Sequence, residues 1–107
     1  LSATGAELRQ SQSMGRTKLE LTQFFAIVLQ RRRRSRGVSR QALAEQAGLH
    51  QTAVGLIERG LRKPNLDTAH LLAEALQVEL SELIQESEKL RRQAREQMFN
   101  EKQKSKK

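Results

Sequence analysis

Cysteine is absent from the 107 residues of this chain, which excludes disulfide bonds and thiolate chemistry. Tryptophan and tyrosine are absent too, and the aromatic residues are three phenylalanines. A core with so few rings has to be built from leucine, valine and alanine, which favours a small helical domain. With two histidines and no cysteine, a metal site is not expected.

Long apolar runs are also missing. No segment reaches the roughly 18 apolar residues that a membrane-spanning helix needs, and the N-terminus has no apolar signal core. We therefore expect a protein of the cytoplasm, with a single domain. Neither a Ser/Cys–His arrangement nor a glycine-rich phosphate loop is present, so we predict no enzymatic activity and no cofactor.

The net charge of +8 is unevenly distributed. Residues 16–40 carry eight basic and one acidic side chain, and residues 91–107 carry seven and two. The segment between them, 41–90, carries four basic and eight acidic side chains. Solvation alone could account for so many cations, but this distribution favours one face that meets a polyanion.

Residues 38–60 have the pattern of two short amphipathic helices joined by a glycine turn. The first helix ends at Gly48, where a left-handed backbone costs glycine little. The second opens at His50 and has Val54 and Ile57 as its apolar residues. Two helices at a steep angle across a short turn form a helix-turn-helix, whose second helix can enter the DNA major groove. The pattern therefore predicts double-stranded DNA as the partner.

A longer pattern surrounds this unit. It comprises Leu29, Arg33, Gly37, Ser39, Leu43, Ala44, Gly48, Val54, Ile57, Glu58, Gly60, Pro64, Ala73, Leu76, Val78 and Leu83. The pattern covers about half of the chain and resembles the Cro/repressor-type (XRE) helix-turn-helix domain. The resemblance implies an all-α, five-helix, lambda-repressor-like domain, here followed by an extended C-terminal helix.

By this resemblance, base readout belongs to the exposed face of the second helix, at Gln51, Thr52, Gly55 and Leu56. Gln51 can pair with adenine through two hydrogen bonds, and Thr52 and Leu56 can touch a thymine methyl group. Gly55 costs on the order of 1 kcal/mol relative to alanine inside a helix. Either it allows close approach to DNA, or the packed domain simply tolerates it.

The start of the first motif helix abuts a DNA phosphate in the resembling family, and Ser39 is well placed to cap that helix here. Basic residues around the second helix suit further phosphate contacts, which fix register without reading sequence. The predicted phosphate contacts are Ser39, Arg40, His50, Arg59, Arg62 and Lys63.

A run of arginines ends the predicted first helix, and consecutive members point in directions about 100° apart. By resemblance, Arg33 forms a structural ion pair with Glu58. Arg32 stands where the family has an apolar residue, so its alkyl stem should pack while its charge reaches solvent. Two roles, phosphate contact or simple solvation, stay open for Arg31, Arg34 and Arg36.

Other helix ends are predicted from local chemistry. Thr22 can cap the first helix, which should run to about Arg36. Asn65 can cap the fourth helix, whose apolar stripe would begin at Leu66. Gln77 stands where the family favours glycine, so strain is expected there.

We expect three segments: a flexible arm over 1–18, the DNA-binding domain over 19–86, and a C-terminal helical extension with a basic tail over 87–107. An apolar stripe, interrupted by Ser87, continues into the extension. It could pair with its twofold mate, or the helix could be solvated and frayed.

These features predict a sequence-specific DNA-binding transcriptional regulator of bacterial type, with a repressor as the favoured form. It would bind a palindromic operator as a homodimer, through the helix at about 51–59. The alternative is an antitoxin or a transcription-bridging module with a toxin or RNA polymerase as partner, because the same fold serves such proteins. RNA binding is disfavoured, because the sequence lacks the surface aromatic residues that recognition of single-stranded RNA normally uses.

Overall fold

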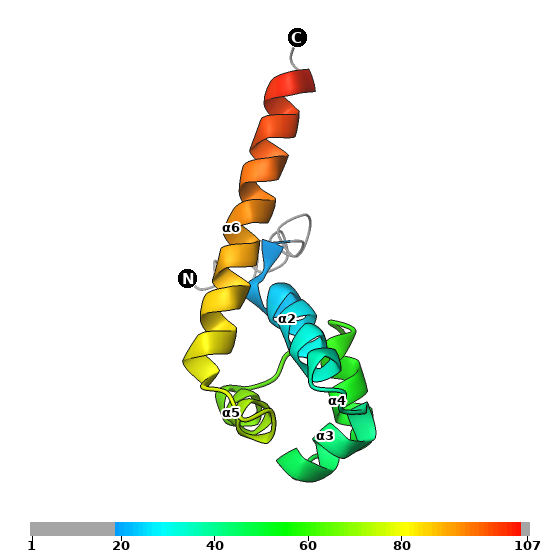
Figure 1. Ribbon diagram of the computed structural model, residues 1–107. Coiled ribbons are helices and arrows are strands. Elements are labelled where there is room, and N and C mark those ends of the chain that lie inside the picture. The colour runs from blue at the N-terminus through cyan, green and yellow to red at the C-terminus, as the bar shows by residue number, and fades with distance from the viewer. Residues whose placement is uncertain (1–18, 106–107) are drawn as a thin grey trace, which may run out of the picture.

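The computed structural model describes residues 19–105, with side chains up to residue 101. This part of the chain forms five helices and no strand, which confirms the predicted fold class (Figure 1). The predicted arm over 1–18 and the last two residues of the predicted basic tail lie outside the described residues. The helices are α2 (Leu21–Ser35), α3 (Arg40–Ala47), α4 (Gln51–Glu58), α5 (Leu66–Ala75) and α6 (Leu80–Ser105).

Helix α2 lies at the centre of the molecule and packs against both α4 and α6 (Figure 1). Phe25, Val28 and Leu29 are buried, as their i, i+3, i+4 spacing predicts. The prediction of a Thr22 cap is wrong, because the helix begins at residue 21. Glu20 is the N-cap residue, and it makes no side-chain capping bond.

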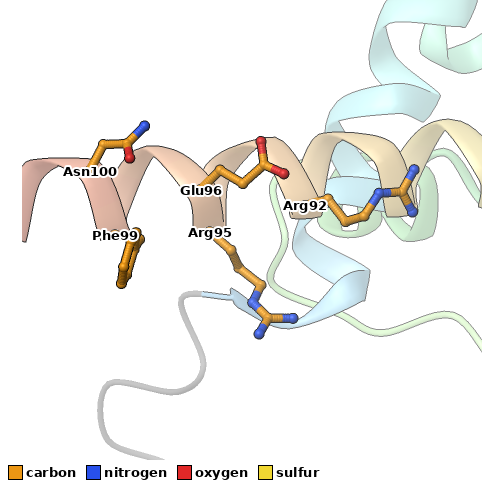
Figure 2. Close-up of a pocket in the computed structure, with 5 residues that line it drawn as sticks. All are labelled: Arg92, Arg95, Glu96, Phe99 and Asn100. Atoms are coloured by element: carbon orange, nitrogen blue, oxygen red, sulfur yellow. The ribbon is translucent and has the colours of Figure 1, made fainter.

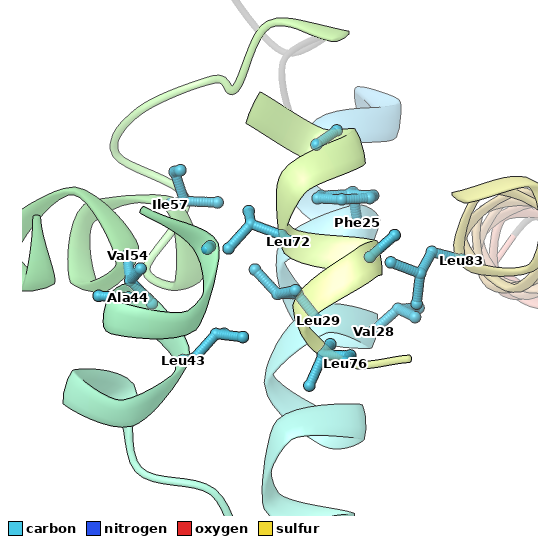
Figure 3. Packing of buried hydrophobic residues seen from close by; sticks show 13 residues of the cluster. Phe25, Val28, Leu29, Leu43, Ala44, Val54, Ile57, Leu72, Leu76 and Leu83 are labelled. Carbon is cyan, nitrogen blue, oxygen red and sulfur yellow. The ribbon is translucent and has the colours of Figure 1, made fainter. Parts of the chain in front are cut away.

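A single hydrophobic core joins all five helices. Leucines from four helices meet there, and Figure 3 shows them facing one another across α2 and α5. Complete burial of such a side chain stabilises a fold by about 1.5–3 kcal/mol, so these few residues dominate the packing energy. The large apolar side chains that are fully buried are Val28, Leu29, Leu43, Val54, Ile57, Leu72, Leu76 and Leu83.

Helix α5 begins where the sequence predicts. The side chain of Asn65 caps it by accepting a hydrogen bond from the Thr68 amide at 2.7 Å. Leu66, however, is 74% exposed, so its predicted place in the apolar stripe is wrong. The helical spacing of Leu66 is correct, but the chain at the start of α5 lies outside the packed layer, since Asn65 and Asp67 are exposed as well. The stripe begins at Ala69 instead.

Helix α6 packs along α2 with its first half and then projects beyond it (Figure 1). Ser87 is fully buried, and its hydroxyl donates to the Leu83 carbonyl at 2.7 Å. The Arg32 guanidinium lies at the surface, where it pairs with Glu82 at 2.7 Å and Glu86 at 2.9 Å, partners that the sequence does not suggest. The first half of α6 is therefore firmly packed. The domain boundary predicted at residue 87 falls inside this continuous helix and stays a prediction.

Candidate nucleic-acid interface

Helices α3 and α4 form the helix-turn-helix unit that the sequence predicts. Ser39 caps α3, since its side chain accepts a hydrogen bond from the Ala42 amide at 3.0 Å. Gly48 ends α3 with a left-handed φ of 73°, which turns the chain toward His50 at the start of α4. The faces that the two helices turn inward consist of Leu43, Ala44, Ala47, Val54 and Ile57.

The outer face of α4 contains the four predicted base-reading positions. Gln51 and Thr52 are exposed, and Leu56 is half-buried. Gly55 is buried, so the expectation of an exposed position is wrong. It has no side chain that could reach past its neighbours. Only the first two positions therefore present a fully accessible polar side chain to a ligand.

The structure brings Arg33 of α2 and Glu58 of α4 together. The Arg33 Nε lies 2.6 Å from Glu58 Oε2, and its Nη2 donates to Oε1 at 3.1 Å. The Glu58 side chain is fully buried. A third bond, from Arg33 Nη1 to the Val38 carbonyl at 2.8 Å, fixes the loop between α2 and α3. This side-chain pair therefore holds the helix-turn-helix against α2.

Arg40 is a further partner of Glu58, with Nε 3.0 Å from Oε1. Burial raises the pKa of Glu58, but hydrogen bonds from Arg33 and Arg40 offset it and hold the pKa below its ordinary value. The sequence suggests only a phosphate contact for Arg40. No local pattern indicates this second contact, which depends on the angle between α3 and α4.

A shallow depression lies where the end of α2 meets the starts of α3 and α4. It brings Gln51, predicted to read a base, next to Ser39 and Arg40, which are predicted to contact a phosphate. Arg34, whose role the sequence left open, also lies at this depression, while the exposed Arg31 does not. The residues that line it are Arg33, Arg34, Ser39, Arg40, Gln41 and Gln51.

The remaining predicted phosphate contacts lie at the two ends of α4. His50 precedes the helix, while Arg59, Arg62 and Lys63 follow it, and all four are exposed. The Lys63 ammonium lies 3.1 Å from the Glu20 carboxylate in an exposed ion pair. Such a pair is weak, so a DNA phosphate could replace Glu20 as the partner.

Arg36 is exposed, and it also makes contacts within the scaffold that the sequence does not suggest. Its Nη1 donates to the Leu76 carbonyl at 2.8 Å and to the Gln77 side-chain oxygen at 3.0 Å. The expected strain at Gln77 is present, because its φ is 61°. This contact joins the end of α2 to the end of α5.

A second accessible surface lies on the projecting half of α6, away from α3 and α4 (Figure 1). Phe99 is 61% exposed, and Met98 beside it is 43% exposed. Figure 2 shows Arg95 and Phe99 on one side of the helix and Glu96 on another. Exposed apolar side chains beside cations suit contact with a protein better than contact with bases.

Within residues 19–105, no helix has an apolar stretch long enough to cross a lipid bilayer. In the same part of the chain, no group of three or more histidine or acidic side chains is arranged to hold a metal ion.

The model of a helix-turn-helix family, HTH_3, matches residues 29–83, slightly more than half of the chain. No curated protein matches the sequence. Among solved structures, the restriction-modification controller protein C.AhdI from Aeromonas hydrophila is similar, with a TM-score of 0.57 and 37% sequence identity. That match covers 58% of this chain and 94% of the controller.

Two further structures are similar at lower identity. A variant of the restriction-modification controller protein C.Esp1396I matches with a TM-score of 0.62 and 25% identity, over 64% of this chain and 90% of that one. An HTH_3 family transcriptional regulator from Vibrio cholerae matches with a TM-score of 0.61 and 29% identity, over 67% of this chain and 40% of that one. The present chain belongs to the helix-turn-helix family, in its Cro/repressor-type (XRE) group, and is a DNA-binding transcriptional regulator.

Proposed function

We propose that this regulator binds a palindromic operator as a homodimer and reads bases with the outer face of α4. The observation that carries the proposal is the depression between α2, α3 and α4. It brings the Gln51 amide next to Ser39 and Arg40, so one surface combines a group suited to a base edge with groups suited to a phosphate. Specific binding needs both kinds of contact, because phosphates set the register and bases supply the sequence information.

Base readout is assigned to the first two turns of α4. The Gln51 amide can donate to N7 and accept from N6 of an adenine, and such a pair discriminates by about 1–3 kcal/mol. Thr52 can donate to a base or touch a thymine methyl group, and the half-buried Leu56 can add an apolar contact. Gly55 has no side chain, so its contribution to binding is the space that it leaves on this face of α4.

Phosphate contacts are assigned to both ends of the motif. At the start of α3, Ser39 and Arg40 combine a hydroxyl, a guanidinium and the positive end of a helix. His50 precedes α4, while Arg62 and Lys63 follow it. With α4 in a major groove, these groups would lie toward the phosphates at the edges of the groove.

A dimer is proposed because one recognition helix offers few base contacts, whereas two symmetric copies double them on a palindrome. The similarity to two restriction-modification controller proteins supports the same regulatory class for this chain. Regulation would follow from binding alone, by covering a promoter or by contacting RNA polymerase in the cytoplasm. In this proposal the protein performs no catalytic step.

A second candidate, an interaction module with a protein partner such as a toxin, is favoured by one observation. Met98 and Phe99 expose apolar surface on a helix that projects beyond the DNA-binding body (Figure 1). The same surface is equally compatible with pairing between two copies. DNA selection separates the two functions, since a pure interaction module selects no DNA sequence.

The test is selection of bound sequences from a random duplex pool at about 150 mM salt, which suppresses purely electrostatic binding. We expect a palindromic motif with half-site centres about one helical turn apart. Gln51→Ala should lose one base preference in each half-site, whereas Gln46→Ala, at an exposed glutamine of α3 outside the depression, should select the wild-type motif. Recovery of no motif by the wild-type protein would overturn the proposal.

A further inference from the structure

One cation of the interface has an unusual position. Successive residues of a helix are rotated by 100°, so Gln51, Thr52, Gly55, Leu56 and Arg59 all lie on one side of α4. Arg59 falls between Gly55 and Thr52 on this side. Its amide donates to the Gly55 carbonyl at 3.1 Å, so the helical geometry extends to this residue. Arg59 is therefore on the base-reading face, although it follows the last residue of the helix.

The Arg59 side chain covers the position of Gly55. A β-carbon built on Gly55 would lie 3.9 Å from Arg59 Nη2. Outside the local helix backbone and the adjacent residues, no other described atom comes within 4 Å of that point. Side chains of a helix lean toward its N-terminus, which carries the guanidinium from the end of α4 back over the preceding turn. A β-carbon at residue 55 would fit beside the guanidinium, whereas a longer side chain there would compete with it for space.

The Arg59 guanidinium is also accessible. The residue is exposed, and its side chain has no hydrogen bond or ion pair within the described part of the chain. Arg33, Arg36 and Arg40 differ, since each of them donates to a protein group. Arg59 thus has its full set of donors available to a ligand that approaches the outer face of α4.

We propose that Arg59 reads a guanine in each half-site, through the space that Gly55 leaves open. A guanidinium presents two parallel donors that match O6 and N7 of guanine in the major groove. This role replaces the phosphate contact that the sequence suggests for Arg59, and it rests on the proposed function. Gly55 then contributes by keeping the guanidinium on the base-reading face, with no contact of its own.

Arg59→Lys separates a base contact from a phosphate contact. Lysine keeps the charge that a phosphate needs but loses the planar pair of donors. In selection from a random pool, Arg59→Lys should weaken the preference for guanine at one position of each half-site, because the lysine ammonium lacks the rigid fork of donors, and it should keep the other positions. Its affinity for the wild-type site should fall about tenfold or more. Affinity for random duplex should change less than about twofold, because its charge is unchanged.

Arg92→Lys is the matched control, since Arg92 is an exposed arginine of α6, away from α3 and α4. It should select the wild-type motif. A chemical arm uses 7-deazaguanine at the selected guanine, which removes the N7 acceptor and leaves every phosphate in place. This base should weaken binding of the wild-type protein and should have little effect on Arg59→Lys.

Substitutions at Gly55 test the second half of the proposal. Gly55→Ala adds a β-carbon at an ordinary contact distance from Arg59, so the guanine preference should survive. Gly55→Met fills the space and should lose that preference, which Arg59→Lys weakens. Circular dichroism of each variant checks that the fold is intact.

The outcomes separate this inference from the proposed function. If the wild-type protein selects no motif, the proposed function fails. If it selects a motif and Arg59→Lys selects the same one with an equally strong preference for that guanine, only the assignment of Arg59 is overturned. Equal loss on selected and random DNA would overturn it too, because that result indicates a phosphate contact.

Discussion

At the scale of single residues, one conformation recurs at the ends of α2 to α5. Gly37, Gly48 and Gly60 follow α2, α3 and α4 with φ near 70°, and Gln77 follows α5 with a φ of 61°. The hydrogen-bond pattern matches at all four places. At the last, the Gln77 amide donates to the Glu74 carbonyl and the next amide donates to the Ala73 carbonyl, at 2.9 and 3.0 Å. Gln77 therefore adopts the left-handed conformation at a cost in free energy, which glycine avoids at the ends of the other three helices.

Gln77→Gly should stabilise the protein. The left-handed conformation costs a residue with a β-carbon about 1 kcal/mol or more. The variant loses the exposed hydrogen bond from Arg36, which keeps its bond to the Leu76 carbonyl. We expect a net gain of about 0.5–1 kcal/mol and a melting temperature higher by about 2–6 °C, measured by circular dichroism. Gln77→Ala is the control, since it loses the same hydrogen bond and keeps the strain; an equal rise for both variants would contradict this account.

Glu58 is the acidic residue on which the interface depends most. Its buried carboxylate accepts hydrogen bonds from both Arg33 and Arg40. Glu58→Gln leaves the buried Arg33 charge without a counter-ion and should reduce the free energy of unfolding by about 3–5 kcal/mol, measured in urea. The exposed Glu45→Gln on α3 should change it by less than about 0.5 kcal/mol.

The pKa of Glu58 also gives a pH dependence with a definite sign. Because its folded-state pKa lies below the ordinary value of 4.5, the unfolded chain binds the proton more readily. The resulting stabilisation is complete above pH 4.5 and is lost as the pH falls through the folded-state pKa. Urea unfolding at several pH values should show a weaker loss of stability on acidification for Glu58→Gln than for the wild type. Parallel curves for the two proteins would rule out Glu58 as the source.

At the scale of elements, α6 shows why an apolar stripe can contain a serine. Ser87 lies one turn after Leu83 and is as completely buried as that leucine. Its hydroxyl donates a hydrogen bond to the Leu83 carbonyl within the helix, so it needs no hydrogen-bond partner on α2. A small residue at this point allows α2 and α6 to approach closely.

Ser87→Leu would complete the apolar stripe, yet it should destabilise the protein. A larger side chain in a fully packed position costs about 1–3 kcal/mol through displaced neighbours. Thermal unfolding should show a lower melting temperature than for Ser87→Ala, which removes only the hydroxyl. A higher melting temperature for the leucine variant would contradict this account, because it would show that the packing between α2 and α6 leaves enough space for a larger side chain.

The elements also show which features of the fold and of the interface can be predicted from the sequence and which cannot. The α3–α4 unit follows local rules, since Ser39 and Gly48 set the start and the end of α3 from their own chemistry. The exposure of Leu66 depends on how far the first turn of α5 extends past its neighbours. The additional contacts of Arg36 and Arg40 join residues 18 to 41 positions apart. Periodicity reports the face of a helix but does not report its neighbour across space, so these contacts are not predictable from it.

At the scale of the whole molecule, the fold places cations and acidic residues on different sides of α2. The exposed cations around α4 lie on one side of α2, and the acidic residues Glu82 and Glu86 lie on the other, on α6 (Figure 1). The latter two are paired with Arg32, which reduces their repulsion of DNA. The cations around α4 therefore attract a polyanion to the side with the helix-turn-helix, at separations up to about 8 Å at physiological salt.

Lys63 tests this arrangement without disturbing the buried network. Its Glu20 partner is exposed, so Lys63→Ala should leave stability nearly unchanged. If Lys63 neutralises one phosphate, its loss should weaken binding to operator and random duplex alike, and the slope of log affinity against log salt should decrease by about 0.9. Lys89→Ala, at an exposed lysine of α6, should keep both the affinity and the slope. A loss confined to the operator, or an unchanged slope, would mean that Lys63 does not contact a phosphate, because counter-ion release depends on charge and not on base sequence.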